Sequence, residues 1–463
     1  MRRRLGTVVL AVCLCGSALH GQPVGAATAG RDPAQWTNRE LAAQLVVSGV
    51  SMSNLTAAES WVRAGLGGIV LLGTPPADLG ARLQRVRRSH ALPPSVMSDE
   101  EGGFVQRLKS VIYPFASAES MGRNLTIAQT SARSAHYAAR MRALGVDVSL
   151  APVADLAIPG YYIERTDRGF SADPARAAAY VEAWQHGMRT VHVTPVVKHW
   201  PGHGQASDTH GGAATTPPFA TLQQRDLIPF NRAITVGVSV FMVGHLNVPG
   251  LTEPRTPASL SPNALRYLRS RIGQSRLIVT DSLSMGAVTT ALGLSQADAS
   301  VRALRAGADV AMVSTNDPMA VVSRIQRALD TGEYARSAAI ISARRLLQVK
   351  RFSNPPQSAV GTSPTSGAVL TSTTPTLSGA VGDPLGGTLT ARFYLRSKGA
   401  TSWNLAWGVP VNVPAGSRAG YAVPVGKLRA GGAYEWAMRS CNSASYCSAY
   451  TPLLRFTVAA AAP

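Results

Sequence analysis

The sequence predicts an α/β protein, namely a (β/α)8 TIM-type barrel followed by a small all-β sandwich of the immunoglobulin/fibronectin-like kind. The barrel is predicted because near-continuous apolar runs alternate along the chain with segments whose apolar residues have helical spacing. Such runs are typical of parallel strands that are buried on both faces. The sandwich is predicted because the apolar period changes to two near the C-terminus. A chain of 463 residues is long enough to hold both domains.

Eight apolar runs supply the strands of the predicted barrel. They cover residues 45–50, 68–73, 95–103, 146–156, 195–204, 238–246, 277–285 and 308–315. The segments between them, such as 78–90 and 174–190, have the apolar spacing of amphipathic helices. A doubly wound open sheet is the alternative, but no G-x-G-x-x-G motif follows the first run, so a dinucleotide-binding fold has little support.

Residues 1–29 are predicted to be a secretory signal peptide. A basic start at 2–4 precedes an apolar run over 5–15, and Ala27, Thr28 and Ala29 form an A-x-A cleavage site. The apolar run is too short to span a bilayer, so no stable membrane insertion is expected. A lipid anchor on Cys13 or Cys15 is less favoured, because bulky residues precede both cysteines. The mature protein is therefore expected to be secreted and extracellular.

The chain beyond the signal peptide divides into three parts. The catalytic barrel is expected over 30–352, where the alternating pattern ends with a helical segment. Residues 353–372, rich in Pro, Ser, Thr and Gly, are predicted to be a linker. The sandwich is expected over 373–463, with a local disulfide between Cys441 and Cys447 and a pair of free thiols as the alternative. Its tryptophans Trp403, Trp407 and Trp436 are expected in the core, although exposed aromatics could instead form a carbohydrate platform.

The formal charge of +20 does not by itself identify a partner. A nucleic-acid surface is not predicted, because no Lys/Arg run is interleaved with aromatic residues and the excess is spread along the chain. An anionic cell wall is a compatible neighbour, and association with it through the C-terminal domain is a hypothesis. That domain could equally bind protein or act as a spacer.

Polar side chains follow five of the predicted strands at their carboxyl ends. They are Asp99, Glu100, Glu101, Asp155, Lys198, His199, His245, Asn247 and Asp281. In a barrel all these ends meet on one face, where active sites of this architecture lie. A buried strand has no structural need for charges at one end, so this pattern predicts an active site.

The stretch VVKHWPGHGQASDTH over 196–210 combines three histidines, a lysine and an aspartate. A metal site built from His199, His203, His210 and Asp208 is one interpretation. The four-residue spacing of His199 and His203 is not helical spacing, however, because Pro201 and Gly202 place a turn between them. No metal and no cofactor is therefore predicted.

Glycosidic chemistry is the favoured interpretation of the same stretch. Cleavage with retained stereochemistry needs a carboxylate nucleophile and a proton donor that later acts as a base. Asp281, at the end of a buried run, is the candidate nucleophile. His210 is the candidate acid/base, with Asp208 two residues before it to fix the imidazole tautomer. Their loop could bring His210 to the glycosidic oxygen when substrate binds.

The motifs SDEEGGFVQRL, KHWPGHGQASDTH and VTDSLSM together resemble the family-3 glycoside hydrolases, and most closely the β-N-acetylglucosaminidase branch. The resemblance covers roughly residues 36–350 and implies a (β/α)8 barrel. It implies that Asp281 is the nucleophile, His210 the acid/base and Asp208 its partner. It further implies a set of sugar-binding residues: Asp99, Arg107, Arg168, Lys198 and His199. The chain departs from the family pattern at Phe104, Gly169, Trp200, Thr209 and Ser282.

The resulting prediction is a secreted retaining exo-β-N-acetylhexosaminidase that forms a covalent glycosyl-enzyme. It would remove terminal N-acetylglucosamine from cell-wall fragments, chitin oligosaccharides or glycoconjugates, so a glycan containing N-acetylglucosamine is the expected partner. Two alternatives remain open: phosphorolysis of the same bond, and a catalytically silent sugar-binding barrel.

Overall fold

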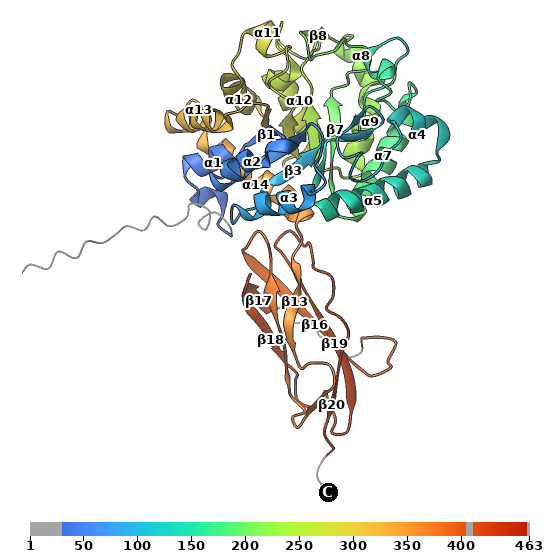
Figure 1. The fold of residues 1–463 in the computed structure, drawn as a ribbon, viewed down its shortest axis with the longest axis vertical. Helices are drawn as coiled ribbons and strands as arrows, with labels where there is room; N and C mark the ends of the chain where they lie inside the picture. The colour runs from blue at the N-terminus through green and yellow to red at the C-terminus, as the bar shows by residue number, and fades with distance from the viewer. Residues whose placement is uncertain (1–29, 404–410, 461–463) are drawn as a thin grey trace, which may run out of the picture.

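The computed structural model describes residues 30–403 and 411–460, and its larger part is a parallel eight-stranded barrel (Figure 1). In sheet order its strands are β11 (Leu277–Thr280), β9 (Val240–Val243), β7 (Thr194–Trp200), β6 (Val148–Ser149), β3 (Ser95–Ser98), β2 (Gly68–Leu72), β1 (Val46–Ser51) and β12 (Ala311–Val313). A parallel bridge between Val279 and Val310 links β11 to the start of the last run, which closes the ring. Each predicted apolar run overlaps one strand of the barrel, so the barrel prediction is confirmed.

Helices surround the barrel and cover its outer face (Figure 1). They are α1 (Asn38–Gln44), α2 (Leu55–Arg63), α3 (Leu79–Arg88), α4 (Ala118–Asn124), α5 (Ile127–Leu144), α6 (Tyr162–Arg165), α7 (Pro174–Thr190), α8 (Phe219–Gln224), α9 (Leu227–Thr235), α10 (Pro262–Ile272), α11 (Thr289–Leu292), α12 (Gln296–Ala306), α13 (Pro318–Asp330) and α14 (Arg336–Ser353). Local sequence fixes their ends: α5, for example, begins with a capping box of Thr126 and Gln129 and ends at Gly145 in the left-handed conformation.

Apolar side chains fill two separate layers of the barrel. Inside the ring, Val70, Val196 and Met242 belong to a buried cluster to which α14 adds Leu346 and Val349. The outer faces of the strands pack against the helices in a second, larger cluster. Near the end of α14, Lys350 Nζ donates to Gln44 Oε1 and to the carbonyl of Pro93, both of which precede strands. This end of α14 therefore lies at the amino ends of the strands.

The C-terminal domain is a sandwich of two sheets, as predicted. One sheet has the order β13 (Gln357–Ser363), β15 (Thr376–Gly382) and β18 (Arg418–Ala422). The other has the order β14 (Ala368–Leu370), β20 (Leu454–Val458), β19 (Ala433–Cys441), β16 (Thr388–Ser397) and β17 (Val411–Pro414). Trp436 is fully buried in the core, Trp403 is half-buried beneath the Arg396 guanidinium, and Cys441 and Cys447 form a disulfide. Trp407 lies outside the described residues.

The linker expected over 353–372 is corrected by the structure. Most of that segment is folded, because β13 pairs with β15 and β14 pairs with β20 as part of the sandwich. Only a short connection remains between the end of α14 and Gln357. The composition that indicated a linker is therefore overridden by strand pairing.

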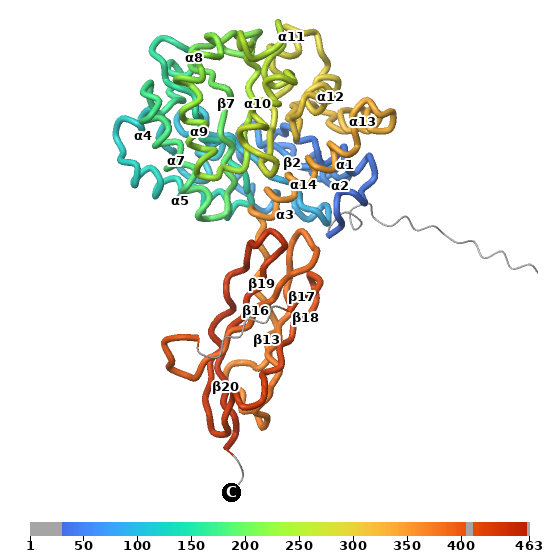
Figure 2. The backbone as a smooth tube through the Cα atoms, turned by 180° about the vertical axis from the view of Figure 1, so that it is seen from behind, coloured from blue at the N-terminus to red at the C-terminus, as the bar shows by residue number. Residues whose placement is uncertain are grey.

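The sandwich lies at the end of the barrel where α14 terminates, and Figures 1 and 2 both show it there. Phe352 and Tyr446 pack edge to face across the junction, with ring centroids 5.4 Å apart. The carboxyl ends of the barrel strands face away from this junction. The predicted signal peptide falls outside the described residues. Within the part of the chain that the structure describes, no helix has the length and apolar character needed to cross a membrane.

Candidate active site

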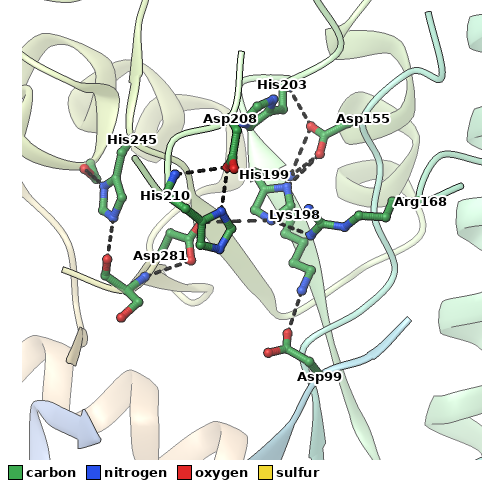
Figure 3. Close-up of polar contacts among 12 residues, drawn as sticks. Asp99, Asp155, Arg168, Lys198, His199, His203, Asp208, His210, His245 and Asp281 are labelled. Carbon is green, nitrogen blue, oxygen red and sulfur yellow. Dashed lines mark hydrogen bonds and ion pairs between the residues drawn. The ribbon is translucent and has the colours of Figure 1, made fainter. Parts of the chain in front are cut away.

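The polar residues that follow the predicted strands come together at the carboxyl end of the barrel (Figure 3). Asp99 follows β3, Lys198 and His199 lie in β7, and Asp281 follows β11 directly. Asp155 enters from the segment after β6, and Arg168 from the loop after α6. Because parallel strands all end on the same face of a barrel, residues far apart in the chain share one site.

A buried network of opposite charges forms one side of this site. Lys198 Nζ donates to Asp99 Oδ1 at 2.7 Å and to Glu101 Oε1 at 2.6 Å. The Arg168 guanidinium donates to both oxygens of Glu101, at 2.7 and 2.9 Å. Burial acts to raise the pKa of Glu101, but Arg168 and Lys198 outweigh it and hold the pKa well below its usual range. Glu101 therefore fixes two cationic side chains beside the cleft.

Replacing this carboxylate is expected to destabilise the barrel strongly. In Glu101→Gln, Arg168 and Lys198 keep their buried positions but lose the charge that compensates them, which costs about 3 kcal/mol of unfolding free energy. Urea unfolding followed by fluorescence measures the loss. The matched control is Glu333→Gln, because Glu333 pairs with Arg324 at the exposed surface and its loss is expected to change stability little. Equal losses in both variants would contradict the interpretation.

A second buried pair orients His199. Its Nδ1–H donates to Asp155 Oδ2 at 2.6 Å, and Asp155 also accepts the backbone N–H of His203 at 2.7 Å. Burial acts to raise the pKa of Asp155, but the interactions with His199 and His203 lower it. With Nδ1 held in this way, Nε2 of His199 lies 3.9 Å from Asp281 Oδ2. Asp155 thus orients the His199 ring, which lies beside Asp281.

The surroundings of Asp281 favour its ionised form. Its side chain is 18% exposed, and its Oδ1 accepts the backbone N–H of Ser282 at 2.8 Å. Burial acts to raise the pKa of Asp281, but the electrostatic influence of His199, His245 and Lys198 outweighs it and lowers the pKa to about 2. The carboxylate is therefore ionised at any neutral or mildly acidic pH, as a nucleophile requires.

His210 differs from Asp281 because it lies on an exposed loop. Its Nδ1–H donates to Asp208 Oδ1 at 2.6 Å, and its backbone N–H donates to the same oxygen at 3.0 Å. The side chain of His210 is 63% exposed, so Nε2 is free to meet a ligand. Burial acts to raise the pKa of Asp208, but the hydrogen bonds from His210 lower it. Asp208 fixes the tautomer in which Nε2 can accept or deliver a proton.

The loops of His210 and Asp281 pack directly against each other at Gly286. The backbone N–H of Gly286 donates to the carbonyl of His210 at 2.8 Å, and that of Ala287 donates to the carbonyl of Thr209 at 3.2 Å. A Cβ on Gly286 would lie 2.6 Å from the carbonyl carbon of Gly211 and 2.7 Å from the carbonyl oxygen of His210. Only glycine permits this close approach.

Gly286→Ala is therefore expected to displace the His210 loop. On the substrate predicted from the sequence, a β-N-acetylglucosaminide, we expect kcat to fall roughly ten-fold, since a displacement of about 1 Å can cost that much or more. The cost in stability is about 1–3 kcal/mol, as for other overpacked sites. Gly80→Ala is the control, because Gly80 lies in α3 and a Cβ there makes only ordinary contacts. Unchanged kcat in Gly286→Ala would show that the contact does not position the loop.

Two adjoining cavities of about 230 and 210 Å³ form the cleft. Both are lined by Asp99, Arg107, Lys198, His210 and Asp281. Five of the eight residues predicted for the site thus line both cavities, and Arg168 and His199 line one of them. Asp208 lines neither cavity and contacts His210 at Nδ1. Arg107 Nε is buried without a hydrogen-bond partner among the described residues, so its guanidinium has donor capacity left for a ligand.

Sequence reasoning missed the roles of three residues in this site. Glu101 is one of the polar residues noted at a strand end, but the sequence does not indicate that it joins Lys198 to Arg168. Asp155 was noted at a strand end, without the partner that the structure gives it. His245 supports the loop that carries Asp281: its Nε2–H donates to the carbonyl of Ser282 at 2.8 Å, and Nδ1 lies 2.7 Å from Ser259 Oγ. Among the described residues, no group of three or more His, Cys, Asp or Glu side chains is arranged to hold a metal ion.

Comparisons with known proteins agree with this geometry. The model of the glycosyl hydrolase family 3 N terminal domain matches residues 37–349. The beta-hexosaminidase LpqI of Mycobacterium tuberculosis is 38% identical over 331 residues, covering 69% of this chain and 84% of that protein. A solved glycosyl hydrolase of the same family from Mycobacterium smegmatis has a TM-score of 0.64 and 37% identity, covering 69% of this chain and 98% of that one. A family 3 β-N-acetylglucosaminidase from a Paenibacillus species has a TM-score of 0.64 and 26% identity, covering 69% and 63%.

The family match begins just before α1 and ends within α14, so it spans the barrel and leaves the sandwich outside. Every cleft residue described above lies inside the matched segment. The barrel and the polar cleft at the carboxyl ends of its strands agree with this match. The chain is therefore a glycoside hydrolase and belongs to glycosyl hydrolase family 3.

Proposed function

We propose that the protein is a secreted retaining exo-β-N-acetylhexosaminidase that removes terminal N-acetylglucosamine from a glycan. The observation that carries this proposal is that an ionised carboxylate, Asp281, and an exposed imidazole, His210, line one cleft with hydroxyl-binding residues. The names of the relatives support the choice of sugar, since they include beta-hexosaminidases and a β-N-acetylglucosaminidase.

The first step joins the sugar to the protein. Asp281 attacks the anomeric carbon while the glycosidic oxygen takes a proton from His210 Nε2, so the carbon–oxygen bond breaks and an ester forms. Asp208 stabilises the imidazolium before the transfer and holds the ring after it. The exposed position of His210 suits a group that must reach a bond between two sugars.

The second step releases the sugar. Neutral His210 Nε2 removes a proton from water, the water oxygen attacks the anomeric carbon, and the Asp281 carboxylate leaves. Two displacements at one carbon return the original β configuration. Water is the proposed acceptor, and phosphate in its place would make the same site a phosphorylase.

The polar end of the cleft suits a sugar. Asp99 and Lys198, together with Arg107 and Arg168, offer both acceptors and donors to sugar hydroxyls. On the side of Asp281, Met242, Met285 and Met312 form an apolar wall that suits the methyl group of an acetamido substituent. Export and retention near an anionic cell wall are part of the proposal, and the predicted signal peptide and the charge of +20 support them.

Hydrolysis of 4-nitrophenyl β-N-acetylglucosaminide beside the matching β-glucoside tests the proposal. We expect cleavage of the acetamido sugar alone, with the β-anomer as the first product by NMR. Added phosphate is expected to leave the product unchanged, and a chelator is expected to leave the rate unchanged. A protein that is inert on both glycosides would favour the sugar-binding barrel, and formation of a sugar phosphate would favour the phosphorylase.

A further inference from the structure

A groove of about 690 Å³ adjoins the catalytic cleft over the ends of β1, β2 and β12. It shares three lining residues with the cavity that contains Asp281, namely Gly49, Leu72 and Ser314. Gly49 lies in β1, Leu72 ends β2, and Ser314 follows β12. None of the proposed catalytic steps uses this space.

The groove differs from the cleft in its chemistry. Among the residues that the structure describes there, those lining the groove are all uncharged, whereas the cleft is lined by Asp, Glu, Lys, Arg and His. Its distinctive side chains are the half-buried Trp61 of α2, the exposed amides Asn54 and Asn316, and the hydroxyls Ser314 and Thr315. One aromatic ring surrounded by neutral hydrogen-bonding groups suits a neutral sugar and offers nothing to an ion.

Strand order relates the groove to the scissile bond. The residues proposed to hold the terminal sugar come from the sector of β3, β6 and β7, and the nucleophile follows β11. Going round the barrel from β11, the next strands are β12, β1 and β2, which are those beneath the groove. A glycan whose anomeric carbon lies at Asp281 can therefore continue past that residue into the groove.

The passage between the groove and the cleft is open, and hydrogen bonds hold one of its walls in place. A Cβ on Gly49 would lie 2.7 Å from Leu72 Cδ1 and 2.8 Å from Ser314 Oγ, so any side chain there would narrow the passage. Gln296 holds the backbone of Ser314 from α12 through two hydrogen bonds, of 3.0 and 2.8 Å. Asn54 precedes α2 without capping it, so its amide is available to a ligand.

We propose that this groove binds the sugars on the reducing side of the cleaved bond, with Trp61 as the stacking platform and Asn54 as a hydrogen-bonding partner. This rests on the proposed function. The preferred substrate is then an uncharged oligosaccharide of β-linked N-acetylhexosamines, and a single sugar on a small aglycone leaves the groove empty.

The test compares N,N′,N″-triacetylchitotriose, called chitotriose below, with 4-nitrophenyl β-N-acetylglucosaminide, using the full chain. We expect Trp61→Ala to lower kcat/KM on chitotriose by about ten-fold, equivalent to about 1.4 kcal/mol, and to leave kcat/KM on the aryl glycoside within two-fold. Trp61→Phe keeps an aromatic face and is expected to restore most of the loss. Because Trp61 also packs against the barrel core, a thermal melt accompanies each variant.

Asn54→Ala serves as a second variant that leaves the core intact, since Asn54 is exposed. We expect its loss on chitotriose to be roughly three-fold, with Gln326→Ala on the outer helix α13 as the unaffected control. If the wild type cleaves the aryl glycoside but neither variant changes the ratio of the two substrates, the subsite is refuted while the proposed function stands. If the wild type cleaves neither substrate, the proposed function fails and the subsite fails with it.

Discussion

Asp281→Ala is expected to lower kcat on an aryl β-N-acetylglucosaminide by about 10⁴-fold, because the variant lacks the carboxylate proposed to form the ester with the anomeric carbon. The fold is expected to be retained, since the Asp281 side chain receives its one hydrogen bond from the neighbouring N–H of Ser282. Added azide is small enough to occupy the space that the carboxylate leaves. It should attack from the same side and give the α-glycosyl azide, which NMR identifies.

Two further measurements sharpen this result. Asp330→Asn, an exposed carboxylate at the end of α13, is the control and should keep full activity. In the wild type, the pKa of about 2 keeps Asp281 ionised down to about pH 2, so loss of the nucleophile's charge should not limit the rate above pH 4. If Asp281→Ala retains more than a tenth of the parental kcat, the assignment of the nucleophile is wrong.

His210→Ala is expected to show an effect that depends on the leaving group. On N,N′-diacetylchitobiose the departing sugar needs a proton, so kcat/KM should fall by about 10²–10⁴-fold. On 4-nitrophenyl β-N-acetylglucosaminide the phenolate leaves without a proton, so the first step should be affected much less. The glycosyl-enzyme should then accumulate, giving a burst of nitrophenol followed by slow turnover.

Azide also distinguishes the general base His210 from the nucleophile Asp281. It needs no general base, so it should accelerate the slow second step of His210→Ala and give the β-glycosyl azide, opposite to the product from Asp281→Ala. His186→Ala, an exposed histidine on α7, is the control. Equal losses on both substrates, with no response to azide, would assign proton transfer to another group.

The positions of two adjacent glutamates, Glu100 and Glu101, could not be predicted from the sequence. Both lie at the carboxyl end of the third apolar run. Glu101 points to Lys198 and Arg168, whereas Glu100 accepts hydrogen bonds from Ser98 and Tyr137 away from the cleft. Burial raises the pKa of Glu100 to about 7, whereas the two cations keep Glu101 ionised. Neighbouring residues of an extended chain face opposite sides. Which side faces the cleft depends on the barrel and cannot be determined from the spacing.

The segment over 353–372 shows a second limit. Its Ser, Thr and Pro content indicated a linker, yet β13 forms because β15 offers a pairing edge. The groove beside Trp61 gave no sequence pattern at all, because α2, α12 and the ends of three strands build it from single residues far apart in the chain.

The sequence by itself determined the alternation of strands and helices, the end of the barrel at which polar residues gather, and the candidates for nucleophile and acid/base. These features follow from apolar periodicity and from local motifs, which are properties of short segments. Only the tertiary structure decided that Glu101 joins two cations, that Asp155 orients His199, and that Gly286 lets two loops meet. Each of these depends on atoms from distant segments coming within about 3 Å of each other, and such contacts exist only once the barrel has closed.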